Sequence, residues 1–266
     1  MHSECCCLQR SSEVRVAWMS QAVVHSDFDN EAPWYWRPVN LFDGTPSETR
    51  REFFNCAKMR GFARGEHVCL ADELADHLYY VVAGLVKVEH ITATGNVTIF
   101  WFCVPGDLFG AGGISGSLRQ GVYSRAVEDS QIALLRRTQF EELVGNHPRL
   151  ALNVIKLMGG RLRLACDAMA EVTQRANLRV GRLLLRLAES CGQWTNKNEV
   201  AIRARISQQE MADMVGCTRQ TVTEVLQSLS RSGIIRIEKR TIHIPSVERL
   251  RTCVEDAEMT DGGSIL

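Results

Sequence analysis

Hydrophobic residues follow two different periods along the chain, and each period predicts a different kind of element. Between residues 61 and 137, short apolar runs are separated by glycine-containing breaks such as Arg64-Gly65 and Pro105-Gly106. This spacing is typical of short strands joined by tight turns, and it predicts a small antiparallel barrel or roll. The predicted strands are 66–70, 78–82, 85–90, 97–104, 121–127 and 131–136.

Other apolar residues recur at intervals of three and four, which is the period of an amphipathic helix. Thr45-Pro46-Ser47-Glu48 has the form of a capping box with proline at the first helical position, and predicts a helix to about Lys58. Further helices are predicted at 138–144, 148–174 and 177–191. The near-heptad seam of the long helix at 148–174 favours a coiled contact between two subunits; packing on its own barrel is the alternative.

Residues 206–235 predict two short helices around a tight turn. Ser207 and Glu210 form a capping box, Gly216 is placed to end the first helix, and Thr218 is placed to cap the second. This pattern favours a helix-turn-helix whose second helix can enter a DNA major groove; a helical hairpin with a solvated face is the alternative. The second helix buries Val222, Val225, Leu226 and Leu229 and exposes Arg219, Gln220, Thr223, Glu224 and Gln227.

A β-hairpin is predicted directly after this pair of helices. Its strands are 234–238 and 241–244, and its turn is Lys239-Arg240. A basic turn tip is well placed to meet DNA phosphates. The hairpin therefore has the position and the charge of a wing beside the helix-turn-helix.

Charge is distributed unevenly along a chain of 266 residues with no net formal charge. Residues 177–252 contain thirteen Lys or Arg against seven Asp or Glu, which suits a polyanionic partner. No apolar run approaches the length of a membrane span, and the N-terminus has no apolar run of signal-peptide type, so a cytoplasmic location is expected. The ten cysteines are then expected to be mostly reduced thiols.

Taken together, the motifs resemble the bacterial regulator family that includes the cyclic-AMP receptor protein and the fumarate-nitrate reduction regulator. The resemblance covers about residues 41–250 and is carried by 207–235 and by three roll segments: G-F-A-R-G-E-H-V, L-Y-Y-V-V-A-G-L-V-K-V and V-P-G-D-L-F-G. It implies an α+β fold with a cyclic-nucleotide-binding-like β-roll, a long dimerisation helix and a C-terminal winged helix-turn-helix. The implied divisions are an N-terminal extension (1–40), the sensor roll (41–147), the dimerisation helix (148–176), the DNA-binding domain (177–252) and a loose tail (253–266).

The implied function is that of a dimeric, sequence-specific transcription regulator that couples a signal at the roll to promoter binding. Its partners would be a palindromic DNA site, a second copy of the chain and RNA polymerase, with no membrane. The alternatives are a cyclic-nucleotide-type regulatory module and a signal-independent DNA-binding protein. No nucleophile–base or metal-hydrolase motif is present in the sequence, so enzymatic activity is not expected.

Residue roles follow from the predicted helices and from the resemblance. Arg219 suits guanine, and Gln220 can pair with adenine or reach several bases. Thr223 can touch a thymine methyl group, and Glu224 can accept from cytosine or hold Arg219 in place. The expected phosphate contacts are Ser207, Gln208, Thr218, Lys239 and Arg240. The expected dimer interface is Leu150, Val154, Leu157, Met158, Leu162, Ala165 and Met169.

The sensor departs from the relatives that bind cyclic nucleotides. Those relatives carry Gly-Glu for the ribose and Arg-Ser for the phosphate, whereas this chain has Gly110-Ala111-Gly112 and Arg119-Gln120. Usual binding of cyclic AMP is therefore not expected. The glycine-rich segment is either a ligand cradle or a flexible turn.

Other effectors remain open at this point. Cys5-Cys6-Cys7 are consecutive, so they cannot readily all reach one iron–sulfur cluster, although Cys56, Cys69 or Cys103 can supply further ligands. A thiol redox switch, haem, an unknown small ligand and constitutive activity are the other options. No metal site is assigned from the sequence.

Overall fold

The computed structural model describes residues 39–110, 112, 114–196, 198–202 and 206–259. The N-terminal extension with Cys5-Cys6-Cys7 and Trp34-Tyr35-Trp36 lies outside the described residues except for its last two positions, and Ala111 also lies outside them.

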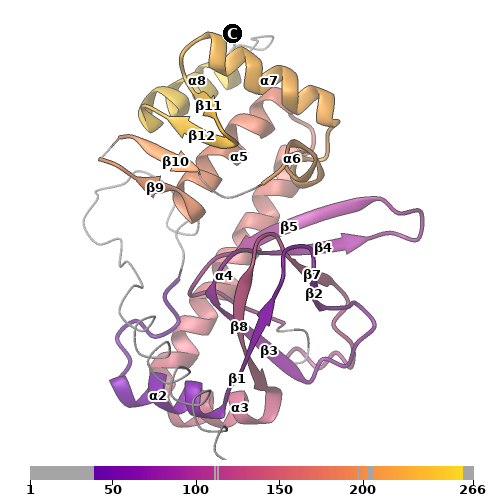
Figure 1. The fold of residues 1–266 in the computed structure, drawn as a ribbon, viewed down its shortest axis with the longest axis vertical. Helices are drawn as coiled ribbons and strands as arrows, with labels where there is room; N and C mark the ends of the chain where they lie inside the picture. The colour runs from indigo at the N-terminus through magenta and orange to yellow at the C-terminus, as the bar shows by residue number, and fades with distance from the viewer. Residues whose placement is uncertain (1–38, 111, 113, 197, 203–205, 260–266) are drawn as a thin grey trace, which may run out of the picture. The chain divides into compact units, whose positions relative to one another are not determined.

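The predicted roll is confirmed as two four-stranded antiparallel sheets, whose strand orders are β1-β8-β3-β6 and β2-β7-β4-β5 (Figure 1). Two of these strands, β1 and β6, were not predicted. The strands are β1 (Lys58–Phe62), β2 (His67–Cys69), β3 (His77–Ala83), β4 (Val86–Ile91), β5 (Val97–Cys103), β6 (Leu108–Phe109), β7 (Tyr123–Ala126) and β8 (Ser130–Arg136).

The β-roll core is formed by residues that alternate inward along these strands. Val81, Val86 and Ile132 are completely buried in one apolar cluster drawn from both sheets. Gly84 turns the chain between β3 and β4 with φ of 92°, and a Cβ there would lie 2.2 Å from Oγ of Ser130. Only glycine therefore fits this turn without displacing β8.

Three helices pack against the roll and form a second apolar cluster with it. They are α2 (Ser47–Cys56), α3 (Arg137–Asn146) and α4 (Pro148–Glu171), and they bury Phe53, Phe140 and Leu150 respectively. The capping box predicted at Thr45 is wrong. Pro46 is the N-cap residue without a side-chain cap, because the Thr45 hydroxyl donates to the Phe42 carbonyl in the preceding turn.

The C-terminal part contains the predicted helix-turn-helix and wing. Its helices are α5 (Ala176–Cys191), α6 (Gln208–Val215), α7 (Arg219–Arg231) and α8 (Val247–Met259). The wing strands β11 (Arg236–Glu238) and β12 (Thr241–Ile244) pair with each other. Two strands that were not predicted, β9 (Gln193–Trp194) and β10 (Val200–Ile202), extend this sheet, with β12 pairing to β10 and β10 to β9.

Residues 253–259 differ from the loose tail expected over 253–266, and residues 260–266 lie outside the described residues. Helix α8 continues to Met259, and its Val254 and Ala257 are buried in the same cluster as the α5 leucines. The correction has a physical basis, because Val247, Leu250, Val254 and Ala257 recur at helical spacing and cover the apolar face of α5. No helix among the described residues is long and apolar enough to cross a membrane.

Candidate nucleic-acid interface

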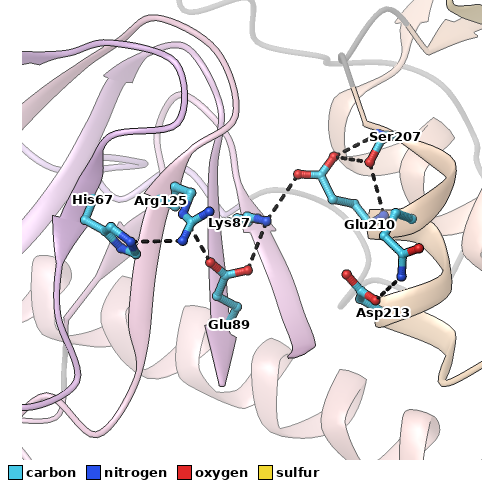
Figure 2. A network of polar contacts seen from close by, with 8 residues as sticks. His67, Lys87, Glu89, Arg125, Ser207, Glu210 and Asp213 are labelled. Carbon is cyan, nitrogen blue, oxygen red and sulfur yellow. Dashed lines mark hydrogen bonds and ion pairs between the residues drawn. The ribbon is translucent and has the colours of Figure 1, made fainter. Parts of the chain in front are cut away.

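The first helix of the motif, α6, begins with the predicted capping box. The Ser207 side chain accepts a hydrogen bond from the Glu210 amide at 3.2 Å, and Oε2 of Glu210 accepts from the Ser207 amide at 2.8 Å (Figure 2). The Ser207 hydroxyl also lies 2.9 Å from Oε2 of Glu210, as its donor. Because the cap already uses the one proton of this hydroxyl, Ser207 has none left for a DNA phosphate in this arrangement.

The turn between the two helices also has the predicted geometry. Gly216 ends α6 in the left-handed region with φ of 68°, where glycine carries no steric penalty. Thr218 caps α7, its side chain accepting from the Thr221 amide at 3.1 Å. These two residues set the direction in which α7 leaves the turn, so they position the residues of its outer face.

Helix α7 separates an apolar face from a polar one. Val222 and Leu229 are completely buried, whereas Arg219, Gln220 and Glu224 are exposed. The amide nitrogen of Gln220 donates to Oε1 of Glu224 at 2.9 Å. The partner of Glu224 in this structure is therefore Gln220, whereas the alternative raised from the sequence was that Glu224 holds Arg219.

A second contact joins the two helices of the motif. The Thr223 hydroxyl lies 2.7 Å from Oε1 of Gln208, the first residue of α6, and 2.9 Å from the Arg219 carbonyl oxygen. The single hydroxyl proton of Thr223 thus has both of its acceptors inside the domain. The methyl group of Thr223 is therefore the part of this side chain that can contact a DNA base. With Oε1 of Gln208 fixed by Thr223, the Gln208 amide nitrogen becomes the donating end of that side chain.

The wing turn consists of two basic residues in the left-handed backbone region. Glu238 of β11 pairs with Thr241 of β12, so Lys239 and Arg240 form the entire loop, with φ of 45° and 70°. Such two-residue hairpin turns favour glycine and asparagine because positive φ is costly for other residues. Strain of this kind is typically kept at functional sites.

The start of α6 also contacts the β-roll. Oε1 of Glu210 lies 3.3 Å from Nζ of Lys87 on β4, and Lys87 in turn lies 2.9 Å from Glu89 (Figure 2). The Glu89 side chain is only 2% exposed and lies 3.5 Å from Arg125. Arg125 completes the chain of contacts by donating to Nε2 of His67 at 2.9 Å.

His67 acts as the neutral end of this charged cluster. Burial and the neighbouring Arg125 lower the pKa of the imidazole, which favours the neutral ring that accepts from a guanidinium. Spacing along β4 places Lys87 and Glu89 on one face, but the sequence contains no signal that their partner is the α6 cap. This cluster was missed at the level of sequence.

The described members of the expected effector set lie together in the roll: Gly110, Gly112, Arg119 and Gln120. A Cβ on Gly110 would lie 2.6 Å from the Tyr79 ring, and one on Gly112 would lie 3.3 Å from the Gln120 carbonyl oxygen. Arg119 donates to the Asp72 carbonyl oxygen. Gln120 is 6% exposed, and neither its amide oxygen nor its amide nitrogen has a partner among the residues that the structure describes. Such an unpaired amide is the kind of group that a polar ligand or an ordered water satisfies.

The described thiols that could serve an iron–sulfur or redox site are of two kinds. Burial raises the pKa of Cys69 to about 11 and that of Cys103 to about 12, so both are protonated near neutral pH. Cys56 is exposed. Over the described ranges of the chain, no three His, Cys, Asp or Glu residues are grouped as metal ligands.

One cation near these thiols was also missed at the level of sequence. The Arg161 guanidinium on α4 lies 5.2 Å above the Trp101 ring, 3.6 Å from Sγ of Cys103 and 4.0 Å from Asp107. Arg161 therefore links α4 to the roll. Nothing in the sequence distinguishes it from the other arginines of this long helix.

The expected dimer residues divide between the two faces of α4. Leu150 and Leu157 are buried in the chain's own core, so they are not available to a second subunit; Val154 and Met158 pack partly against the same core. Leu162, Ala165 and Met169 are exposed. Further exposed positions lie in line with them and were not predicted: Leu152, Ile155, Cys166 and Val172.

The structure combines a capped helix-turn-helix, whose second helix is exposed and polar, with a basic wing. A long helix joins these elements to a β-roll. This combination defines a DNA-binding regulator with a sensory domain. Comparison with known families supports this class. Residues 178–253 match the model of the Crp-like helix-turn-helix domain, and residues 59–147 match that of the cyclic nucleotide-binding domain.

Individual relatives match the chain over most of their length. The chain is 29% identical to the nitrogen fixation regulation protein FixK of Azorhizobium caulinodans over 190 residues, 71% of this chain and 73% of that one. It is 25% identical to a CRP-like cAMP-activated global transcriptional regulator of Mycobacterium tuberculosis, over 71% of this chain and 84% of that protein. The solved structure of FixK2 from Bradyrhizobium japonicum superimposes with a TM-score of 0.64 at 26% identity, and the match covers 74% of this chain and 96% of that one.

The chain belongs to the CRP/FNR family of transcription regulators. It is a DNA-binding regulator with a sensory domain of the cyclic-nucleotide-binding type, in a family whose members typically dimerise.

Proposed function

We propose that two copies of the chain bind a palindromic DNA site, with each α7 in a major groove and each wing on the adjacent phosphates. The observation that supports this most directly is the outer face of α7, where Arg219, Gln220 and Glu224 are exposed over a fully apolar inner face. Two-fold symmetry would place the half-sites about one helical turn apart.

The proposed base contacts are Arg219, Gln220 and Thr223; Glu224, the fourth residue expected from the sequence, lies beside them as the hydrogen-bond partner of Gln220. Arg219 supplies a guanidinium fork for guanine, and Thr223 supplies its methyl group because its hydroxyl has acceptors inside the domain. Gln208, Thr218, Lys239 and Arg240 are the proposed phosphate contacts. Ser207 contributes through its cap, which fixes the start of α6, since its hydroxyl is already used.

The proposed dimer interface is the exposed stripe of α4. Ile155, Leu162 and Met169 are seven residues apart and each is more than half exposed. A seven-residue apolar repeat is the seam of a two-stranded coiled coil, and exposed apolar stripes of this kind mark subunit contacts. Leu150 and Leu157 are excluded from this interface by their burial within one chain.

The proposed effector differs from cyclic AMP bound in the usual manner. The position corresponding to the phosphate arginine of the relatives is the uncharged Gln120, which offers no cation to a phosphate. The relatives include one named for cyclic-AMP activation and one named for nitrogen-fixation regulation, so the family does not supply the signal. An ultraviolet–visible spectrum of protein purified without oxygen separates haem, iron–sulfur and colourless forms.

RNA polymerase is the proposed partner on DNA, as befits a chain whose relatives are transcription regulators; the proposal assigns the chain no catalytic step. Transcription in vitro tests this, with a promoter that carries the DNA site selected by the protein from a randomised library. The same experiment distinguishes activation from repression.

The central test is Arg219→Ala. The full-length variant is expected to lose about 1–3 kcal/mol of binding free energy on the selected site and to accept any base where the wild type requires guanine. Sequence selection from a randomised library, followed by footprinting, measures both effects. An unchanged footprint and an unchanged selected motif would show that Arg219 contacts no base, and the assignment of α7 as the recognition helix would then be wrong.

A further inference from the structure

The side chains of Gln220 and Glu224 form one hydrogen-bonded unit on the outer face of α7. They are four residues apart, so they lie on the same face of the helix one turn from each other. The Gln220 amide nitrogen donates to Oε1 of Glu224 at 2.9 Å, and both side chains are exposed where a base edge would meet the helix.

This contact fixes which end of the Gln220 amide faces which way. A glutamine side chain carries one acceptor oxygen and one donor nitrogen that differ little in shape, so an unheld amide can present either one to a base. A carboxylate has acceptors only, and therefore it can bind only the nitrogen end. With Glu224 beside it, Gln220 directs its nitrogen toward the C-terminal end of α7 and its oxygen away.

We propose that Glu224 is a positioning residue for DNA recognition: by holding the amide nitrogen of Gln220, it makes Gln220 read adenine and reject guanine. The inference rests on the proposed function of α7. The amide nitrogen has two hydrogens, and one remains for N7 of adenine after the other is donated to Glu224; the amide oxygen accepts from N6. Guanine presents acceptors at both O6 and N7, so an amide held in this orientation faces O6 with its own acceptor.

The charge of Glu224 supports a positioning role over an independent contact. A carboxylate brought beside DNA phosphates without a donor is unfavourable, and the Gln220 nitrogen supplies that donor from within the protein. Gln227 provides a matched control, because it lies three residues further along the same helix and is also exposed.

The experiment uses the full-length chain and a library with a randomised palindrome. Wild-type protein selects a motif, and Gln220→Ala identifies the base pair that Gln220 reads. Binding is then measured with each of the four base pairs at that position. Wild-type protein is expected to prefer adenine over guanine by about tenfold. In Glu224→Ala this preference is expected to fall to within about twofold, while the preference at the guanine read by Arg219 persists.

Two further variants test the positioning role itself. In the Gln220→Ala background, Glu224→Ala is expected to change no base preference, because the residue through which it acts is gone. Gln227→Ala is expected to leave the adenine preference intact. Thermal melting by circular dichroism confirms that all variants are folded.

The outcomes separate this inference from the proposed function. If wild-type protein selects no motif, the proposed function fails. If it selects a motif but Glu224→Ala keeps the adenine preference, the positioning role is wrong and the function stands. A change of preference caused by Glu224→Ala in the Gln220→Ala background would show that Glu224 reads a base itself, which also overturns the inference.

Discussion

Lys239 and Arg240 show how a single turn can serve binding at the expense of stability. Replacing both by the sequence Asn-Gly, which suits positive φ, is expected to raise the free energy of unfolding by about 1–2 kcal/mol. The same change removes two positive charges from the wing tip. DNA affinity is therefore expected to fall, and the salt dependence of binding to decrease by about one ion for each lost phosphate contact.

A matched control separates the two effects in this turn. Replacing both residues by glutamine removes the charges but keeps side chains that disfavour positive φ. This variant is expected to lose DNA affinity without a gain in stability, as measured by urea denaturation and by binding at several salt concentrations. Equal stability of the Asn-Gly and Gln-Gln variants would contradict the presence of strain in the wing.

The thiols allow a second prediction at the scale of single residues. Cys69 and Cys103 are buried and have raised pKa values, whereas Cys56 and Cys166 are exposed. Because the thiolate is the reactive form, iodoacetamide at about pH 8 is expected to modify Cys56 in the native protein and to spare the buried pair until unfolding. Cys166 lies in line with the proposed dimer stripe of α4, so it is expected to react only when the subunits are apart. Mass spectrometry of peptides checks this. Native labelling of Cys103 would show that the interior opens.

At the scale of elements, α4 combines two apolar faces with different roles. Leu162→Glu is expected to give a folded monomer, because this side chain is 68% exposed and contributes to the outer stripe. Leu157→Glu is the matched control: it places a carboxylate in the core and is expected to destabilise the fold by several kcal/mol. Light scattering gives the mass, and circular dichroism gives the fold. A Leu162→Glu protein that stays dimeric would place the interface elsewhere.

The same helix shows what the sequence could and could not predict. Its existence follows from the three-and-four spacing, but Leu157 and Leu162 both fit that spacing. Only the packing of α2, α3 and the roll decides which of the two is buried. The strand β9 is too short to show a period, whereas α8 has a helical period that the expectation of a loose tail overlooked.

The helix-turn-helix and the outer face of α7 were predicted more completely than the side-chain contacts that these helices make. The cap at Ser207, the turn at Gly216 and the outer face of α7 are local properties, so the pattern of residues defines them. The pairing of Gln220 with Glu224 depends on rotamers, and that of Lys87 with Glu210 depends on two distant segments. The four-residue spacing of Gln220 and Glu224 permits their contact without specifying it, and nothing in the order of the residues indicates the contact of Lys87 with Glu210.

At the scale of the whole molecule, the roll and the helix-turn-helix share a buried charged contact. Strand β5 packs against α6, and one apolar cluster includes Ile99 of the roll and Met211 of α6. Lys87 lies between Glu89 and Glu210 at the same contact, with its side chain only 10% exposed. A buried ion that loses its partner is strongly destabilising, so Lys87 holds two carboxylates in an otherwise unfavourable environment.

Lys87→Ala is therefore expected to lower the free energy of unfolding by about 3 kcal/mol, chiefly because it leaves Glu89 buried with Arg125, at 3.5 Å, as its one remaining cation among the described residues. The double variant Lys87→Met, Glu89→Leu removes the cation and its most buried carboxylate together, and replaces them with apolar side chains of similar size. It is expected to recover at least half of the loss, since buried ion pairs are often replaced by apolar groups at little cost. Urea denaturation of the full chain measures both. If the double variant is as unstable as Lys87→Ala, the loss comes from packing around Lys87 and not from an unpaired Glu89.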